Sequence, residues 1–113
     1  MTYEELEALR NKMTEEDTEA AEDMTAALEQ VLEENSFRRM PRSVRTAGLG
    51  FGCMEIFRHG GVYTVVRNNG SGLDKLPAYG SAEECFVSLV SAIYGVSKPK
   101  GFAKEQYERF FGE

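Results

Sequence analysis

The segment FGCMEIFRHGGVYTVVR, residues 51–67, decides the fold. Two runs rich in β-branched and aromatic side chains, Phe51 to Arg58 and Val62 to Arg67, lie on either side of Gly60-Gly61. Paired glycines accept the positive φ angles of a tight hairpin turn, so the segment predicts two antiparallel strands.

A two-residue turn fixes the pairing of these strands, with Ile56 opposite Val65 and Arg58 opposite Tyr63. Side chains alternate between the two faces of a strand. One face then holds Met54, Ile56, Tyr63 and Val65, and the other holds Phe51, Cys53, Phe57, Val62 and Val66. Because both faces are partly apolar, we expect helices on one face and either a partner or the C-terminal segment on the other.

The strands belong to a larger sheet over residues 44–79. Asn69-Gly70 marks the next turn, and the stretch from Leu73 to Tyr79 adds a short strand. Pro77 confines that strand to an edge, because proline has no N–H to donate to a ladder. This region therefore predicts an antiparallel meander of roughly three to four strands.

Residues 1–35 are predicted to be helical. Thr2 and Glu5 have the spacing of a capping box, and Thr14 offers a second N-cap. The apolar side chains nevertheless stay in phase on one helical face across Thr14. This apolar stripe comprises Leu6, Leu9, Met13, Ala20, Met24, Ala27, Leu28 and Val31.

The capping signal and the apolar stripe disagree on whether this segment is one helix or two. One helix of about 32 residues is about 48 Å long, whereas a domain of this size has a radius of gyration of about 13 Å. Such a rod overhangs its own domain and needs a partner to cover its free end. We therefore favour a break at Thr14 and keep the single helix as the alternative.

Residues 81–112 predict two more helices. Ser81 and Glu84 repeat the capping-box spacing, and Gly95 is a suitable stop for the first helix. Its buried face is predicted to carry Cys85, Phe86, Leu89, Val90 and Ile93. Phe102 to Phe111 then closes the chain as a short helix. We therefore predict a single α+β domain over residues 1–113: an N-terminal helical segment, an antiparallel meander and two C-terminal helices.

Charge is unevenly divided along the chain. Residues 1–36 carry twelve acidic side chains against Arg10 and Lys12, which gives a formal charge of 2 minus 12, or -10. The rest of the chain carries eleven basic and seven acidic side chains, which gives 11 minus 7, or +4. An acidic helical face can steer and hold a cationic partner, and a merely solvated face is the alternative explanation.

The amino-acid composition is that of a globular protein. The hydrophobic fraction of 42% and the charged fraction of 28% are those of an ordinary globular domain. The first residues lack the cationic and apolar regions of a signal peptide, and no apolar run is long enough to cross a bilayer. We expect a soluble, cytoplasmic protein with no membrane partner.

We predict no enzyme activity, no cofactor and no metal site. His59 is the single histidine and is expected at the solvated hairpin tip. Cys53 and Cys85 form no C-x-x-C pair, so we expect buried thiols, with one disulfide as the alternative. Four arginines between residues 38 and 45 suggest phosphate binding, but the net charge of -6 opposes a nucleic-acid partner. For most of these arginines we favour ion pairs with the acidic helix.

The stretch from Phe51 to Val90 resembles small immunity proteins of bacterial polymorphic toxin and contact-dependent inhibition systems. The resemblance is carried by EIFRHGGVYTVVRN at residues 55–68, by Tyr79 and by SAEECF at residues 81–86. In such proteins a hairpin of this kind leads through a short loop into an acidic-capped helix. The resemblance implies a small, chemically inert protein that caps the active site of a basic toxin, such as a nuclease.

Charge places the partner-binding surface on the N-terminal helical segment. The predicted contacts are the carboxylates Glu15, Glu19, Glu22, Asp23, Glu29 and Glu33, with Tyr3, Tyr79 and Tyr107 as aromatic anchors. The partner is predicted to be a basic protein, the cognate toxin domain. The alternative is a regulatory or scaffold protein that forms a homodimer through the apolar stripe.

Overall fold

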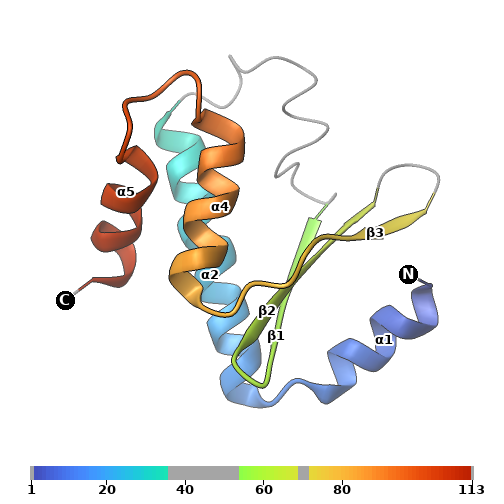
Figure 1. Ribbon diagram of the computed structural model, residues 1–113. Helices are drawn as coiled ribbons and strands as arrows, with labels where there is room; N and C mark the ends of the chain where they lie inside the picture. Colours follow the sequence, from blue (N-terminus) through green and yellow to red (C-terminus); the bar gives the residue numbers. More distant parts are fainter. Residues whose placement is uncertain (1, 36–53, 69–71, 113) are drawn as a thin grey trace.

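The computed structural model describes residues 2–35, 54–68 and 72–112, which form an α+β fold (Figure 1). The elements in chain order are α1 (Tyr3–Lys12), α2 (Glu15–Glu34), β1 (Met54–His59), β2 (Val62–Asn68), β3 (Leu73–Lys75), α4 (Ala82–Tyr94) and α5 (Phe102–Phe111). The prediction of helices, an antiparallel sheet and two C-terminal helices is confirmed. The predictions for the arginine-rich connector, for Phe51 and Cys53, and for the Asn69-Gly70 turn concern residues outside the described ranges.

The β1–β2 hairpin has the predicted register. Ile56 pairs with Val65 and Arg58 with Tyr63, across a turn in which Gly60 and Gly61 have φ angles of 60° and 79°. These positive angles are easily reached only without a Cβ atom, which explains the two glycines. The turn therefore sets which side chains share each face of the sheet.

The third strand is shorter than predicted. β3 pairs antiparallel with β2 and ends at Lys75. Beyond it, Leu76 N donates to Val65 O at 2.9 Å, and Tyr79 exchanges two backbone hydrogen bonds with Tyr63 as an isolated bridge. Pro77 lies between these contacts and has no N–H, so the ladder is interrupted there. In the described part of the chain the sheet has three strands, in the order β1-β2-β3.

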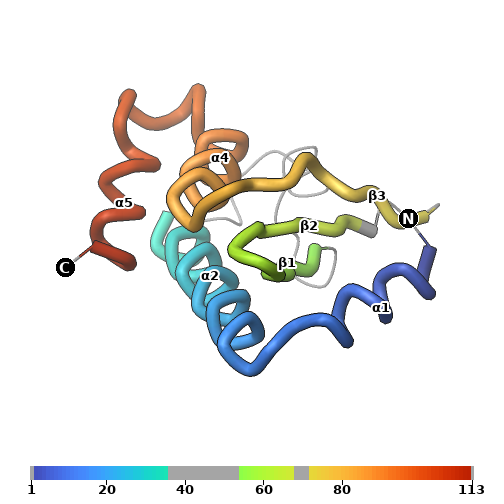
Figure 2. The backbone as a smooth tube through the Cα atoms, turned by 60° about the horizontal axis from the view of Figure 1, so that its bottom comes forward, coloured from blue at the N-terminus to red at the C-terminus, as the bar shows by residue number. Residues whose placement is uncertain are grey.

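The N-terminal segment breaks into two helices at Thr14, as we favoured. Thr14 caps α2 with a full capping box: Asp17 N donates to Thr14 Oγ1 and Thr14 N donates to Asp17 Oδ2, both at 3.1 Å. Met13, which ends α1, is extended with a ψ of 132°. The two helices therefore leave Thr14 in different directions (Figure 2).

The break distributes the apolar stripe over both faces of the sheet. On one face, α2 and α4 enclose the main core, to which the sheet contributes Ile56, Tyr63 and Val65. On the other face, Leu6 of α1 packs with Phe57 and Val66. We predicted a partner or the C-terminal segment as the cover of this second face, and that prediction is wrong. α1 covers it, because the break at Thr14 turns α1 away from the axis of α2.

The C-terminal helices form as predicted. All five side chains predicted for the inner face of α4 are buried, and Gly95 caps its end. α5 packs its aromatic side chains on Phe86, whose ring centroid lies 5.9 Å from that of Tyr107 and 5.6 Å from that of Phe111. A bidentate ion pair between Arg109 and Glu34, with Nη2–Oε2 at 2.6 Å, ties α5 to the end of α2.

This ion pair predicts a pH-dependent contribution to stability. Hydrogen bonds from Arg109, and secondarily from Gln30, lower the pKa of Glu34 from its ordinary value of 4.5 to about 2. A depressed pKa means that the contribution is complete above pH 4.5 and is lost as the pH falls towards about 2. The melting temperature of Glu34→Gln should therefore lie below that of the wild type at pH 6, and the difference should vanish near pH 2.

The control is Glu33→Gln, which changes an exposed neighbour on the same helix. Its melting temperature should follow that of the wild type at every pH. A Glu34→Gln difference that keeps the same size from pH 6 to pH 2 contradicts the assignment of this ion pair.

Candidate functional site

The predicted carboxylates form an exposed acidic face on α2. Glu15, Glu19, Glu22, Asp23, Glu29 and Glu33 are all exposed, whereas Met24, Leu28 and Val31 on the opposite side are at most 2% exposed. Among the described residues, every ion pair is formed by other carboxylates. The acidic face, which we define by these six residues, therefore carries negative charge that no cation among the described residues pairs with.

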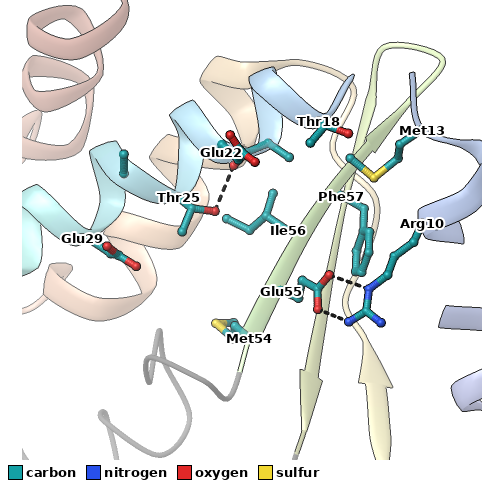
Figure 3. A pocket seen from close by; sticks show the side chains of 12 residues that line it. Arg10, Met13, Thr18, Glu22, Thr25, Glu29, Met54, Glu55, Ile56 and Phe57 are labelled. Carbon is teal, nitrogen blue, oxygen red and sulfur yellow. Dashed lines mark hydrogen bonds and ion pairs between the residues drawn. The ribbon is translucent and has the colours of Figure 1, made fainter. Parts of the chain in front are cut away.

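A groove of about 540 Å³ runs beside this face, between α2, β1 and the end of the first helix (Figure 3). The side chains that line it come from three places. α2 contributes Thr18, Ala21, Glu22, Thr25, Ala26 and Glu29, β1 contributes Met54, Glu55, Ile56 and Phe57, and the first helix and its end contribute Arg10 and Met13.

The groove has an apolar floor and a charged rim. Ile56 and Phe57 are 8% and 0% exposed, and the thioethers of Met13 and Met54 extend this floor. Methionine side chains adapt to ligands of different shape, so the floor suits an apolar group of a partner. The rim carries Glu22 and Glu29, two members of the acidic face.

The third carboxylate at the groove, Glu55, is neutralised within the protein. Arg10 Nε donates to Glu55 Oε2 at 2.9 Å and Arg10 Nη2 donates to Glu55 Oε1 at 2.5 Å. The same guanidinium lies 6.0 Å from the centroid of the Phe57 ring. This bidentate pair links α1 to β1, and it leaves Glu22 and Glu29 as the carboxylates available to a cationic ligand.

A second charged cluster lies at the joint between the helices and the hairpin. Asp17 is buried, and its Oδ1 lies 3.4 Å from Arg58 Nη1, while His59 Nδ1 lies 4.0 Å from Asp17 Oδ2. The backbone N–H of Thr14 is the main cause of the lowered pKa of Asp17. The expected solvent exposure of His59 is confirmed, since its side chain is 53% exposed.

The three predicted aromatic anchors do not form one cluster on the acidic face. Tyr3 is 67% exposed and lies on α1. Tyr79 and Tyr107 are partly buried against the main core, and Tyr107 stacks on Phe111 with ring centroids 5.0 Å apart. Both therefore stabilise the protein itself, and their role as anchors stays a prediction.

The groove itself was missed from the sequence. Its two sides come from residues far apart in the chain: Arg10 meets Glu55 across 45 positions. Two features of the sequence together could have indicated the groove. The first strand of a meander lies at a sheet edge, and an N-terminal helix that breaks early can fold back beside that strand. The acidic face, in contrast, follows from helical periodicity alone.

Comparison of the chain with protein-family models, curated proteins and solved structures gave no match. The resemblance of the stretch from Phe51 to Val90 to small immunity proteins therefore stays a prediction. Across the described residues, none of the helices combines the length and apolar character that a bilayer span needs. The function must be argued from the acidic face and the groove.

The thiol of Cys85 is placed where it cannot act as a nucleophile. It is 0% exposed, and burial raises its pKa to about 12. Since the thiolate is the reactive form, this thiol is inert at neutral pH. The prediction that Cys85 is buried is confirmed, whereas Cys53 lies outside the described residues.

In a Cys53→Ser variant, Cys85 is the single remaining thiol. We predict that a colourless aromatic disulfide reagent at pH 8 labels it at a rate set by unfolding, and labels it within seconds in guanidinium chloride. Absorbance of the released thiolate measures both rates. Rapid stoichiometric labelling of the native variant contradicts the burial and the raised pKa.

Proposed function

We propose that this protein is a non-catalytic binding protein whose acidic face and groove dock a basic protein domain. Within that class, we propose an immunity protein that neutralises a cognate toxin domain. The observation that carries the proposal is the position of two carboxylates, Glu22 and Glu29, on the rim of a groove with an apolar floor, where no described cation pairs with them.

The two properties of this site contribute different parts of a binding reaction. The carboxylates of the acidic face attract a cationic surface over a distance of about one Debye length and so speed association. The half-buried side chains of Met13 and Met54 supply apolar area that a partner can cover, which slows dissociation once the partner is seated. The alternative, an acidic helix face that only contacts solvent, gives no reason for an apolar groove beside that face.

A nuclease is the toxin class that this chemistry fits best. An enzyme that cleaves nucleic acid must present Lys and Arg side chains to hold phosphates at its active site. A row of carboxylates on a rigid helix has the opposite charge to such a surface and is therefore complementary to it. By covering this surface, the helix excludes the nucleic acid. The resemblance of the hairpin and α4 to small immunity proteins points to the same function.

Self-association through the apolar stripe has less support. Met24, Leu28 and Val31 are at most 2% exposed within one chain, and Leu6 is buried against Phe57. The stripe is therefore already covered by the protein's own sheet and helices. A homodimer would have to use another surface.

We predict that a neighbouring gene encodes a basic toxin domain and that the acidic face steers the binding of this domain. Stopped-flow fluorescence should show an association rate that falls about tenfold or more between low and physiological salt, because exposed charges are then screened. Glu22→Lys/Glu29→Lys should lower the rate at low salt by a similar factor and should abolish protection of cells from the toxin.

The matched control is Glu105→Lys/Glu108→Lys, which makes the same change in net charge at exposed positions of α5. The control should lose much less of the association rate and should still protect. Equal losses in both variants, or a rate indifferent to salt, contradict docking at the acidic face. Failure of the encoded domain to bind at all contradicts the immunity assignment.

A further inference from the structure

Among the described residues, the outer edge of β1 has no strand partner. β1 is the first strand in the order β1-β2-β3 and pairs with β2 along one side. In the described part of the chain nothing pairs with its other side. An edge of this kind is a template on which a further strand can add.

The register identifies which backbone groups point outward. With a two-residue turn, the pairs His59–Val62, Phe57–Thr64 and Glu55–Val66 exchange hydrogen bonds within the hairpin. The alternate residues Met54, Ile56 and Arg58 therefore direct their N–H and C=O groups away from β2.

Contacts on the far side of β2 confirm this alternation. Tyr63 and Val65, the partners of Arg58 and Ile56, use their backbone groups towards β3 and the residues that follow it. Tyr63 N donates to Tyr79 O at 2.8 Å, and Val65 O accepts from Leu76 N at 2.9 Å. Their partners on β1 must then point the opposite way, to the edge.

The groove runs along this same edge. It is lined by Ile56, whose side chain lies on the α2 face of the sheet, and by Phe57, whose side chain lies on the α1 face. A groove that reaches both faces of one strand lies along the edge of the sheet and not over either of its faces. α2 forms one wall and the end of α1 the other (Figure 3). The backbone of β1 runs between these two helices (Figure 2).

We propose that β1 accepts an extended segment of the partner as an added strand, with cationic and apolar side chains in alternation. This inference rests on the proposed function and specifies how the partner is held. Main-chain hydrogen bonds to Ile56 and Arg58 would give affinity. The two walls of the groove would contact alternate side chains of the added strand and so give specificity.

The charges around the groove decide which side chains the segment carries. Arg10 is paired with Glu55 and Arg58 with Asp17, so both cations at the edge are compensated. Within the part of the chain that the structure describes, no cation pairs with Glu22 or Glu29 on the α2 wall. These two carboxylates therefore select Lys or Arg on the side of the added strand that faces α2. The other wall is formed by Met13 and Arg10 over Phe57 and selects apolar side chains.

The probe is an eight-residue peptide of alternating Lys and Val, acetylated and amidated at its ends. Two further peptides carry N-methyl groups, on all Lys residues in one and on all Val residues in the other. N-methylation removes donors on one edge of a strand and leaves the charges unchanged. Fluorescence anisotropy measures affinity, and amide hydrogen exchange measures protection of individual residues of the protein.

Strand addition predicts that the parent peptide binds and that one N-methylated peptide binds about tenfold or more weakly, because several hydrogen bonds of the ladder are lost. The other should bind nearly as well as the parent, since its methyl groups point to solvent. Exchange at the amides of Ile56 and Arg58 should slow on binding, whereas that of Phe57 is already protected. Glu22→Lys/Glu29→Lys should weaken the parent peptide.

Three outcomes overturn the inference. The first is that both N-methylated peptides bind as well as the parent and that the exchange of Ile56 and Arg58 is unchanged; docking by charge then stands without strand addition. The second is that no peptide binds, while the toxin domain is still captured in the salt-dependent manner described above. The third is that these amides are protected without peptide in a concentration-dependent dimer, which places a second copy at the edge.

Discussion

The capping box of α2 is the constraint on which the remaining structure depends. The side chain of Thr14 accepts from Asp17 N while Asp17 accepts from Thr14 N, so the chain must leave the helical path there. A cap of this kind contributes only about 1 kcal/mol, but it fixes a direction. Asp17 also contacts Arg58 at 3.4 Å, which ties the break to the tip of the hairpin.

Both the core and the candidate site follow from this break. Because α1 turns back, Leu6 covers Phe57 on one face of the sheet while α2 covers Ile56 on the other. The same turn places Arg10 beside Glu55 and leaves β1 at the base of a groove between two helices. A single straight helix would cover one face and would form no second wall.

The sequence predicted those parts of the fold that local rules decide. Gly60-Gly61 set the hairpin register, and the period of α4 indicated its buried face, because each depends on residues close in the chain. The position of α1 could not be predicted in this way. Leu6 and Met24 share a helical phase in the sequence, and periodicity contains no information about the rotation of the chain at Thr14.

The candidate site was predictable to a similar extent. Helical periodicity placed Glu22 and Glu29 on an exposed face, but nothing local distinguished them from Glu15 or Glu33. Their role as the rim of the groove depends on contacts between α2 and β1, which are formed only in three dimensions. The partner-facing role of Tyr79 and Tyr107 rested on residue type, and the core contacts of these rings are not visible in the sequence.

The most direct test of the break is the distance between the two ends of the N-terminal segment. Spin labels at Glu4 and Glu33, attached through cysteines in the Cys53→Ser background, report this distance by double electron–electron resonance. A continuous helix places these positions about 44 Å apart at 1.5 Å per residue. The break at Thr14 predicts one narrow distribution clearly shorter than this value, and a distribution centred near 44 Å would contradict it.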